Sequence, residues 1–334
     1  MDKRNIVVIG ASAGGVSALQ TLVARLPADF DAAVLVVMHI PVHTPTFLHA
    51  ILDRAGPLPA KLAENGEPIV GGTIYVAPTD RHLVIENQQI RLTQGPRENR
   101  VRPCIDALFR SAALEFGTRV VGVVLTGMLD DGTSGLWSVK DRGGVTIIQS
   151  PDDAAYPAMP ESALKHVSID YIQPLAQIGD TLIRLCSEPV SVDAEKPPRE
   201  LLKLETKIAI EGDALKQGVM DMGENSRNTC PECHGVMVKM REGSILRFRC
   251  HTGHAFSLKT LLVDVDKTIE NTLWAAVRAI EERALLLREM EHLSRDKVDT
   301  PQTNALANEA TAAEERAQVV RELIVAGDSE KPFV

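Results

Sequence analysis

The sequence is poor in aromatic residues, in positive charge and in long apolar runs. Aromatic side chains make up 4% of its 334 residues, and the formal net charge at pH 7 is −9. A general nucleic-acid-binding protein presents an excess of basic residues, so this composition argues against nucleic acid as a partner. No apolar stretch reaches the roughly 18–20 residues that a membrane-spanning helix needs, so we expect no membrane insertion. The early "IVVIG" is too short for the core of a signal peptide.

Cysteine is also scarce, and its placement argues against a framework of disulfides. The chain has five cysteines, an odd number, and three of them lie within the short segment from Cys230 to Cys250. Clustering of this kind favours a metal site in a reducing compartment over paired disulfides. We therefore expect a cytoplasmic protein.

Short apolar runs alternate with helix-like segments from residue 5 to about residue 186. Runs such as "NIVVIG", "AAVLVVMHI" and "VVGVVLTGM" are rich in Val and Ile and apolar on both faces, which is typical of buried parallel strands. Segments between them, such as "VSALQTLVARL", carry apolar residues at helical spacing. The alternation predicts an α/β fold with a doubly wound, mostly parallel sheet over residues 1–188. The stretch "GTIYVAPTDRHLVIENQQIRLT" suggests an antiparallel hairpin, so we expect a mixed sheet.

The second half of the chain has a different composition. Residues 189–228 are polar and Pro-rich at their start, which predicts a linker with a short helix near 200–212. Residues 229–257 hold the clustered Cys and His residues. Over residues 258–326 apolar residues recur every three or four positions, which predicts a long helical hairpin. Packing within the chain and homodimerisation through these helices would both bury the apolar stripe.

A glycine-rich turn, "GASAGG", follows the first apolar run and fits two chemistries unequally. A dinucleotide-binding turn requires glycine where Ser12 stands, and an acidic residue at the end of the second strand. Asp29 and Asp31 precede that strand instead. The spacing Gly10-x-Ser12-x-Gly14 matches a nucleophile elbow, a sharp turn that exposes a serine hydroxyl. We therefore favour Ser12 as a nucleophile.

A serine nucleophile needs an adjacent base and an acid that orients the base. His39 ends the second predicted strand, and Asp130 and Asp131 lie just past a later one. Because the carboxyl ends of parallel strands meet at one edge of a sheet, these side chains are expected near Ser12. The sequence therefore predicts a Ser-His-Asp site.

Two assignments stay open on these grounds. His43 or His82 could take the place of His39 as the base. The Asp-Asp-Gly turn offers both Asp130 and Asp131, and either can instead cap the helix that follows.

Five motifs make the chain recognisable: "VVIGASAGG", "VVMHIP", "YVAPTDRHLVI", "IDALFRSAA" and "VVLTGMLDDGTSG". In order and spacing they resemble the catalytic domain of CheB-type protein-glutamate methylesterases of bacterial chemotaxis, over residues 5 to about 186. The resemblance implies a methylesterase-like fold in which Ser12 is the nucleophile, His39 the general base and Asp131 the orienting acid. The family's usual Gly-Met-Gly-Asn-Asp-Gly is here "GMLDDG", so Leu129 and Asp130 depart from it.

The resemblance also implies a reaction and a partner. The substrate would be a glutamate γ-methyl ester, or a glutamine, on the cytoplasmic helices of a methyl-accepting chemotaxis receptor. Backbone N–H groups of Ala13 and Met128 would meet the oxyanion, and catalysis would need no cofactor. Two-domain relatives carry a receiver domain before the esterase, whereas the strand before Ser12 begins almost at Met1, so we expect no switch by phosphorylation in cis. Two other functions fit the same residues: hydrolysis of another ester or amide, and an adaptor with a vestigial esterase half.

The Cys/His segment has the spacing of a zinc site. Cys230 and Cys233 form C-x₂-C, and Cys250 and His254 form C-x₃-H. Four such donors can converge tetrahedrally on Zn²⁺. We predict a zinc-ribbon-like module with one structural zinc ion, in which His251 is the alternative to His254.

Overall fold

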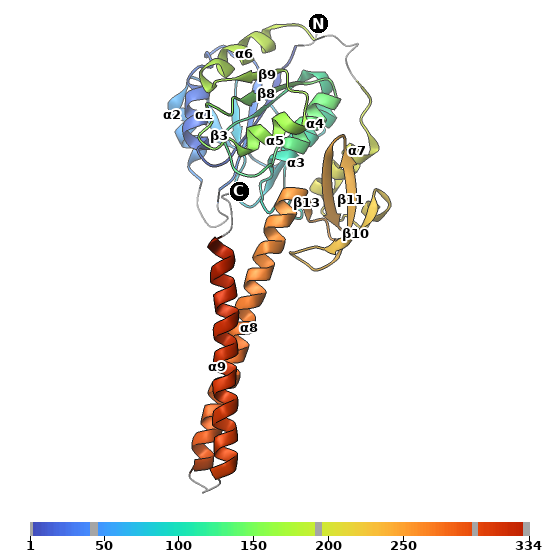
Figure 1. Ribbon diagram of the computed structural model, residues 1–334. Helices are drawn as coiled ribbons and strands as arrows, with labels where there is room; N and C mark the ends of the chain where they lie inside the picture. Colours follow the sequence, from blue (N-terminus) through green and yellow to red (C-terminus); the bar gives the residue numbers. More distant parts are fainter. Residues whose placement is uncertain (1–2, 41–45, 191–195, 296–299, 330–334) are drawn as a thin grey trace. The chain divides into compact units, whose positions relative to one another are not determined.

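The computed structural model of the protein describes residues 3–40, 46–190, 196–295 and 300–329 (Figure 1). The chain forms two compact units, Met1–Leu261 and Leu262–Val334. Within the described residues, no helix combines the length and apolar character needed to cross a bilayer.

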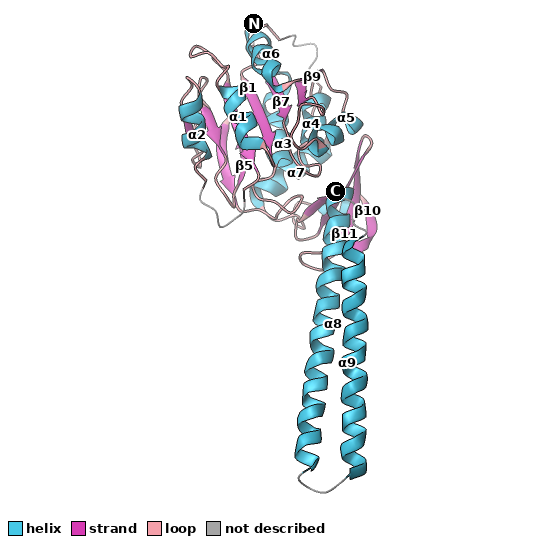
Figure 2. Cartoon of the chain, turned by 60° about the vertical axis from the view of Figure 1, so that its left-hand side comes forward, coloured by secondary structure: helices cyan, strands magenta, loops and turns pink. Residues whose placement is uncertain are grey.

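A seven-stranded sheet forms the centre of the first unit (Figures 1 and 2). Its order is β3-β4-β2-β1-β7-β8-β9, and every pair of neighbours is parallel. The bounds are β1 Ile6–Ala11, β2 Ala33–Met38, β3 Ala60–Leu62, β4 Ile74–Val76, β7 Val120–Val124, β8 Val145–Gln149 and β9 Tyr171–Gln173. The doubly wound parallel architecture predicted from the sequence is confirmed.

The expectation of a mixed sheet is wrong. β5 (His82–Glu86) and β6 (Gln89–Thr93) do form an antiparallel hairpin, but it is a two-stranded sheet of its own. β4, which lies in the same predicted stretch, joins the main sheet in parallel. The hairpin packs Leu83 and Ile85 under the helices of one face, so its apolar residues are buried without a place in the main sheet.

Helices cover both faces of the sheet because its strands are apolar on both sides (Figure 2). In β1, Val7 and Ile9 pack in one core with α1 (Gly15–Val23), α2 (Leu48–Ala55) and α6 (Leu175–Ser187). Ile6 and Val8 face the other core, with α3 (Ile105–Phe116), α4 (Thr133–Asp141) and α5 (Ala158–His166). We call this sheet, its helices and the β5–β6 hairpin the α/β part.

A second, antiparallel sheet follows within the same unit. Its order is β10-β11-β12-β13, with bounds Glu224–Thr229, Val236–Glu242, Ile245–Cys250 and Ala255–Ser257. We call residues 224–257 the Cys/His module. The preceding segment, expected as a linker with a short helix, holds α7 (Glu200–Glu211) and a 3₁₀ turn at Val219–Asp221. α7 packs on the hairpin and on α3: Thr93 Oγ1 donates to the Ala209 carbonyl at 2.6 Å, and Ala209 shares a small core with Ala107.

A buried charge cluster joins the module to the α/β part. Its members are each at most 4% exposed, and they are Glu98, Arg110, Glu205, Glu242, Arg247 and Arg249. Arg249 forms a bidentate pair with Glu205 at 2.7 and 2.8 Å and reaches Glu98 at 2.9 Å. Burial alone would raise the pKa of Glu205, but the guanidinium groups of Arg247 and Arg249 lower it to about 2. Glu205 therefore stays ionised, which buried arginines require of their partner.

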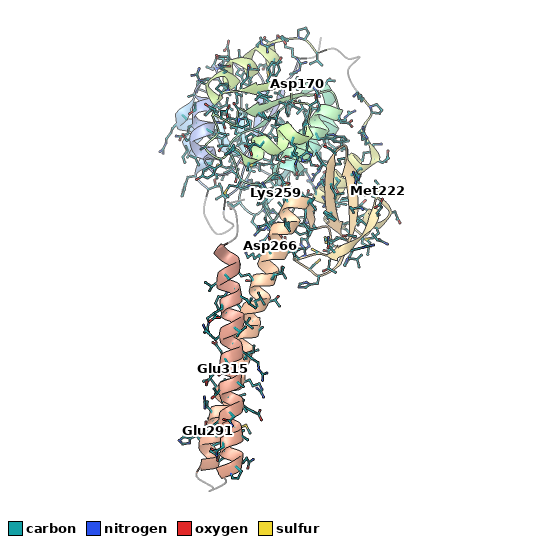
Figure 3. All side chains as sticks on the ribbon, in the orientation of Figure 1. Asp170, Met222, Lys259, Asp266, Glu291 and Glu315 are labelled. Carbon is teal, nitrogen blue, oxygen red and sulfur yellow. The ribbon has the colours of Figure 1, made fainter. Side chains whose placement is uncertain are left out.

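The second unit is the helical hairpin predicted from the sequence. α8 spans Leu258–Arg295 and begins at the end of the first unit, and α9 spans Thr300–Ser329. A seam of small buried residues, including Ala284, Ala310 and Ala317, lies between the helices, and surface ion pairs such as Arg288–Glu314 at 3.0 Å connect them. Other side chains project outward, among them Glu315 of α9 (Figure 3).

The apolar stripe of α8 is only partly buried. Val277 and Leu287 lie in the seam with α9, whereas Leu262 is 61% and Ile269 53% exposed. The first turns of α8 therefore present apolar residues that α9 does not cover.

Candidate active site

Ser12, His39 and Asp131 lie at the carboxyl ends of the three central strands. Ser12 follows β1 directly, His39 follows β2 directly, and Asp131 lies in the loop between β7 and α4. β1 has β2 on one side and β7 on the other, so the winding of the sheet reverses at this point. Open α/β sheets hold their sites at such a switch point, because the loops on either side diverge there.

The three side chains form one hydrogen-bonded relay. His39 Nδ1 is 3.3 Å from Ser12 Oγ, and His39 Nε2 is 2.8 Å from Asp131 Oδ2. A carboxylate can only accept, so Nε2 carries the hydrogen, and the lone pair of Nδ1 faces the serine hydroxyl. This arrangement lets the imidazole remove the proton of Ser12 while the carboxylate stabilises the imidazolium that forms.

Asp131 is a buried carboxylate held by an unusually complete set of donors. Besides His39, these donors are Ile105 N (2.8 Å), Asp106 N (3.2 Å), Gly132 N (3.0 Å), Asn99 Nδ2 (3.0 Å) and Cys104 Sγ (3.1 Å). Two of these N–H groups open α3, so the carboxylate also caps that helix end. Burial alone would raise the pKa of Asp131, but the hydrogen bond from His39 and the other donors hold it below its ordinary value. Asp131 is therefore ionised at neutral pH.

A second buried carboxyl group, Asp106, lies beside Asp131. Its oxygens accept from Gly135 N at 2.7 Å and from Asn99 Nδ2 at 2.9 Å. Burial and the charge of Asp131 raise the pKa of Asp106 to about 8. Asp106 and Asp131 together therefore carry one negative charge at neutral pH, and this charge lies on Asp131, which contacts His39. Sequence reasoning missed Asp106, which looks like an ordinary acidic residue in the first turn of a helix.

The alternatives for the base and the acid do not meet Ser12. His82 is fully buried, and burial lowers its pKa. Its Nε2 forms a hydrogen bond with the Pro96 carbonyl at 3.0 Å, and its Nδ1 accepts a hydrogen bond from Cys104 N at 3.3 Å. His43 lies outside the described residues. Asp130 faces the Cys/His module, where its carboxyl group pairs with Ser257.

The turn at Ser12 is built by close backbone approaches. Ser12 N donates to the Thr126 carbonyl at 3.0 Å, and Gly14 takes the left-handed conformation, with φ of 75°. A Cβ at Gly127 would lie 2.9 Å from Ser12 Cβ, so only glycine fits there. Over the described residues, neither Ala13 N–H nor Met128 N–H has a hydrogen-bond acceptor in the protein, so both can donate to a ligand.

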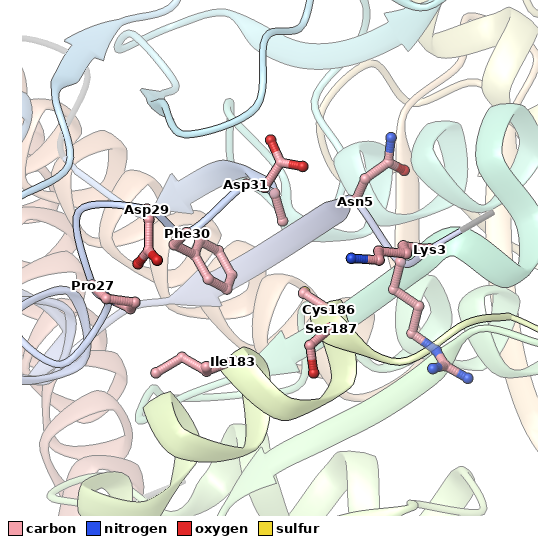
Figure 4. Close-up of a pocket in the computed structure, with 11 residues that line it drawn as sticks. Lys3, Asn5, Pro27, Asp29, Phe30, Asp31, Ile183, Cys186 and Ser187 are labelled. Carbon is pink, nitrogen blue, oxygen red and sulfur yellow. The ribbon is translucent and has the colours of Figure 1, made fainter. Parts of the chain in front are cut away.

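The acids considered for a nucleotide lie at the opposite edge of the sheet. Asp29 and Asp31 line a pocket with Lys3 and Cys186 next to the amino ends of β1 and β2 (Figure 4). Ser12 lies at the carboxyl end of β1. The glycine turn and these acids therefore cannot bind the phosphate and the ribose of one nucleotide.

The predicted metal ligands converge in the Cys/His module. Cys233 Sγ and Cys250 Sγ are 3.7 Å apart, and His254 Nδ1 is 3.7 Å from Cys230 Sγ and 3.6 Å from Cys250 Sγ. The four ligand atoms all lie within 4.8 Å of one another. With Zn–S near 2.3 Å and Zn–N near 2.0–2.1 Å, the edges of a regular tetrahedron would be about 3.5–3.8 Å. The three separations given above match these edges, so the four donors lie close enough together to hold one zinc ion.

Neighbouring groups orient these ligands. Glu232 Oε2 is 3.3 Å from His254 Nε2, the nitrogen that would face away from a metal on Nδ1. The Thr252 hydroxyl contacts the sulfurs of Cys233 and Cys250 at 3.1 and 2.9 Å. His251 lies outside the converging set, and its ring packs against Gly235.

Comparison with known proteins places the first half of the chain. A family model described as CheB methylesterase matches residues 7–182. A Clostridium acetobutylicum protein named protein-glutamate methylesterase/protein-glutamine glutaminase is 38% identical over 186 residues, 55% of this chain and 54% of that protein. A Leptospira interrogans protein with the same two activities in its name is 38% identical over 180 residues, 54% of this chain and 93% of that protein.

A solved structure agrees with these relatives. The CheB methylesterase catalytic domain of Thermotoga maritima aligns with a TM-score of 0.53 and 35% identity, over 55% of this chain and all of that one. The matched residues contain the parallel sheet and its three central strand ends. The chain belongs to the CheB methylesterase family.

Proposed function

We propose that the protein is a serine esterase that hydrolyses glutamate γ-methyl esters on the cytoplasmic helices of chemotaxis receptors. The observation that carries the proposal is the relay from Ser12 through His39 to Asp131 at the switch point of a CheB-type sheet. Relatives are named protein-glutamate methylesterase/protein-glutamine glutaminase, which supports the same reaction here. The reaction would take place in the cytoplasm, where such receptor helices lie.

The first half of the reaction forms an acyl-enzyme. The Ser12 proton passes to His39 Nδ1 while Oγ attacks the ester carbonyl carbon, giving a tetrahedral oxyanion. The N–H groups of Ala13 and Met128 are the donors proposed for that oxyanion. When the intermediate collapses, the C–O bond to the methoxy group breaks and His39 returns the proton, so methanol leaves.

The second half regenerates the enzyme. Water attacks the acyl carbon and gives a proton to His39. As the Ser12 ester bond breaks, His39 returns that proton to Ser12 Oγ, and the glutamate side chain is released. A glutamine side chain would follow the same path, with ammonia as the first leaving group. Asp131 remains ionised throughout and holds the orientation of the imidazole.

We also propose that Cys230, Cys233, Cys250 and His254 bind one structural zinc ion, while the reaction itself uses protein groups alone. The ligand spacing and the Glu232 contact behind His254 support this site. Elemental analysis of the purified chain should give one zinc per chain, and Cys230→Ser should reduce that ratio. A chain that folds without bound metal would contradict the zinc proposal.

The helical hairpin of α8 and α9 supports a further proposal, that the protein forms a homodimer. Large apolar side chains are more than half exposed along it, among them Leu262, Leu285 and Leu323. A second copy could cover such residues in a four-helix arrangement. Light scattering of the intact protein should give twice the mass of one chain, and a monomer at micromolar concentration would contradict the dimer.

The activity is tested with receptor cytoplasmic fragments methylated by their cognate methyltransferase. The wild-type chain should release methanol, and Ser12→Ala should abolish the release. Ser17→Ala, an exposed serine on α1, is the matched control and should leave the rate unchanged. Labelling of Ser12 by a fluorophosphonate without methanol release would favour another ester or amide as substrate. Neither labelling nor release would favour an adaptor with an inactive esterase half.

A further inference from the structure

One side chain, Asn99, connects the Cys/His module to the proposed catalytic acid. It lies in the loop between β6 and α3 and is 4% exposed. Its Nδ2 donates to Asp131 Oδ1 at 3.0 Å and to Asp106 Oδ2 at 2.9 Å. Its Oδ1 accepts from Ser257 N at 3.1 Å, where β13 ends. Carboxylates only accept and a backbone N–H only donates, so the orientation of the amide is fixed.

The backbone of Asn99 is held by the same module. Asn99 N donates to the Ala255 carbonyl at 2.8 Å, and Ala255 N donates to the Arg97 carbonyl at 3.2 Å. Residues 97–99 thus pair with β13 along its otherwise open edge. Asn99 has a φ of 50°, a left-handed conformation that asparagine tolerates better than most residues.

The residue before Asn99 belongs to the buried charge cluster. Glu98 meets Arg249 at 2.9 Å and Arg247 at 3.3 Å, both from β12 of the module. Thr260 Oγ1, in the first turn of α8, donates to Asn99 Oδ1 at 3.5 Å. Groups of the Cys/His module, more than 140 residues away in the sequence, therefore hold the side chain of Asn99, its backbone and the residue before it.

We propose that Asn99 is a positioning residue for Asp131, and that the Cys/His module sets its position and thereby governs turnover at Ser12. The hydrogen bond to Oδ1 leaves Oδ2 directed at His39. Since the orientation of the acid fixes the imidazole, a displaced Asn99 would disturb the base. The proposal rests on the proposed esterase function, and it gives the module a role in the reaction.

The first test replaces Asn99 in the full-length protein. Asn99→Ala should lower the rate per active Ser12 by about 10- to 100-fold, the loss expected for one hydrogen bond to a charged group. Active sites are counted by stoichiometric fluorophosphonate labelling, so that misfolded protein does not contribute. Asn225→Ala, an exposed asparagine on β10, is the control and should match wild type.

The variant Asn99→Asp distinguishes a loss of activity caused by misplacement of Asp131 from one caused by misfolding. Its protonated carboxyl group can donate to Asp131, whereas its ionised form places a second negative charge beside Asp131 and can donate neither to Asp131 nor to Asp106. The rate of Asn99→Asp relative to wild type should therefore fall as pH rises, while that of Asn99→Ala relative to wild type should not. A rate for Asn99→Ala within twofold of wild type, or a pH profile for Asn99→Asp identical to that of wild type, would overturn the role of Asn99.

The role of the module is tested by a double-mutant cycle. Cys233→Ala should lower both bound zinc and the rate per active Ser12. If the module acts through Asn99, the double variant Asn99→Ala/Cys233→Ala should lose little more than the worse single variant. Fully additive losses, or loss of zinc with an unchanged rate, would overturn the coupling.

The double-mutant cycle remains informative even if the proposed substrate is wrong. A failed esterase assignment shows as wild-type protein that is labelled at Ser12 but releases no methanol. The rate of Ser12 labelling, which needs the same base, then reports the effect of Asn99. Unchanged labelling in Asn99→Ala would overturn the positioning role independently of the substrate.

Discussion

Replacing Glu205 with glutamine removes one negative charge from the middle of the buried charge cluster. Glu205 is fully buried on α7 and pairs with Arg247 and Arg249, while Glu98 and Glu242 supply the other two carboxylates of the cluster. With Arg110, the cluster holds three positive and three negative charges. Glutamine has nearly the same shape, so the change leaves packing intact and leaves one buried guanidinium charge uncompensated.

The expected cost follows from the environment of the carboxylate. The guanidinium groups lower the pKa of Glu205 from 4.5 to about 2 against the effect of burial, which corresponds to about 3 kcal/mol in favour of the ionised form. Breaking a buried ion pair on one side generally costs about 3–5 kcal/mol. At about 2 cal/mol/K per residue, unfolding a unit of the size of Met1–Leu261 has an entropy near 0.5 kcal/mol/K. The melting temperature of that unit should therefore fall by about 5–9 °C.

The assay is calorimetry of the full-length protein at pH 7 and pH 3. The control is Glu200→Gln on the same helix, whose side chain is 79% exposed and pairs with Lys203 at the surface, so its melting temperature should match wild type. The folded-state pKa of Glu205 is depressed, so its contribution is present above pH 4.5 and is lost as pH falls toward 2. The difference between Glu205→Gln and wild type should shrink to about 1 kcal/mol at pH 3. A shift under 2 °C at pH 7, or one that does not shrink at pH 3, would refute the reasoning.

Three further changes test the active site. Asp131→Asn should lower kcat about 10⁴-fold, because a neutral amide cannot stabilise the imidazolium, and a loss below tenfold would contradict its role as the orienting acid. Gly127→Ala places a Cβ 2.9 Å from Ser12 Cβ and 2.1 Å from Met159 Sδ, so kcat/KM should fall about 100-fold, and the melting temperature should fall by about 2–6 °C because both neighbours must shift. The raised pKa of Asp106, about 8, means that the folded state keeps a proton that the unfolded state loses near pH 4, so wild-type stability should decline by up to about 1 kcal/mol per unit between pH 5 and pH 8. Urea unfolding should show a flatter decline for Asp106→Asn, and equal slopes would argue against a protonated Asp106.

The parallel sheet and the meeting of Ser12, His39 and Asp131 were accessible from the sequence. Each of the three residues follows a run of Val and Ile that is apolar on both faces, and parallel strands bring their carboxyl ends to one edge. The Cys and His spacing likewise predicted which four donors converge. In these cases a local pattern, combined with one topological rule, was enough.

The packing of the Cys/His module on the α/β part could not be predicted from local sequence patterns. Arg247 and Arg249 alternate with Leu246 and Phe248 along β12, a pattern typical of a strand with one solvent-facing side. Both arginines are buried because Glu98 and Glu205 meet them, and these partners lie 42 or more residues away. Charged residues rarely lie inside a protein unless they are paired, and pairing over such distances leaves no local signal.

Asn99 was missed for the same reason. It lies in a polar stretch, "ENRVR", that predicts an exposed loop, and its burial depends on β13. Asp106 is equally ordinary in the sequence, and its raised pKa comes from its burial together with the nearby charge of Asp131. Contacts between segments far apart in the chain decide both positions.

The edges of the two larger sheets limit how an extended peptide could pair with either of them. The outer strands of the parallel sheet, β3 and β9, have three residues each. In the antiparallel sheet, β10 is a polar edge with an irregular register, and residues 97–99 already occupy the side of β13. Short, irregular and occupied edges resist the addition of a further strand, the same property that protects proteins from aggregating edge to edge. Recognition of a helical target through side chains would avoid this restriction.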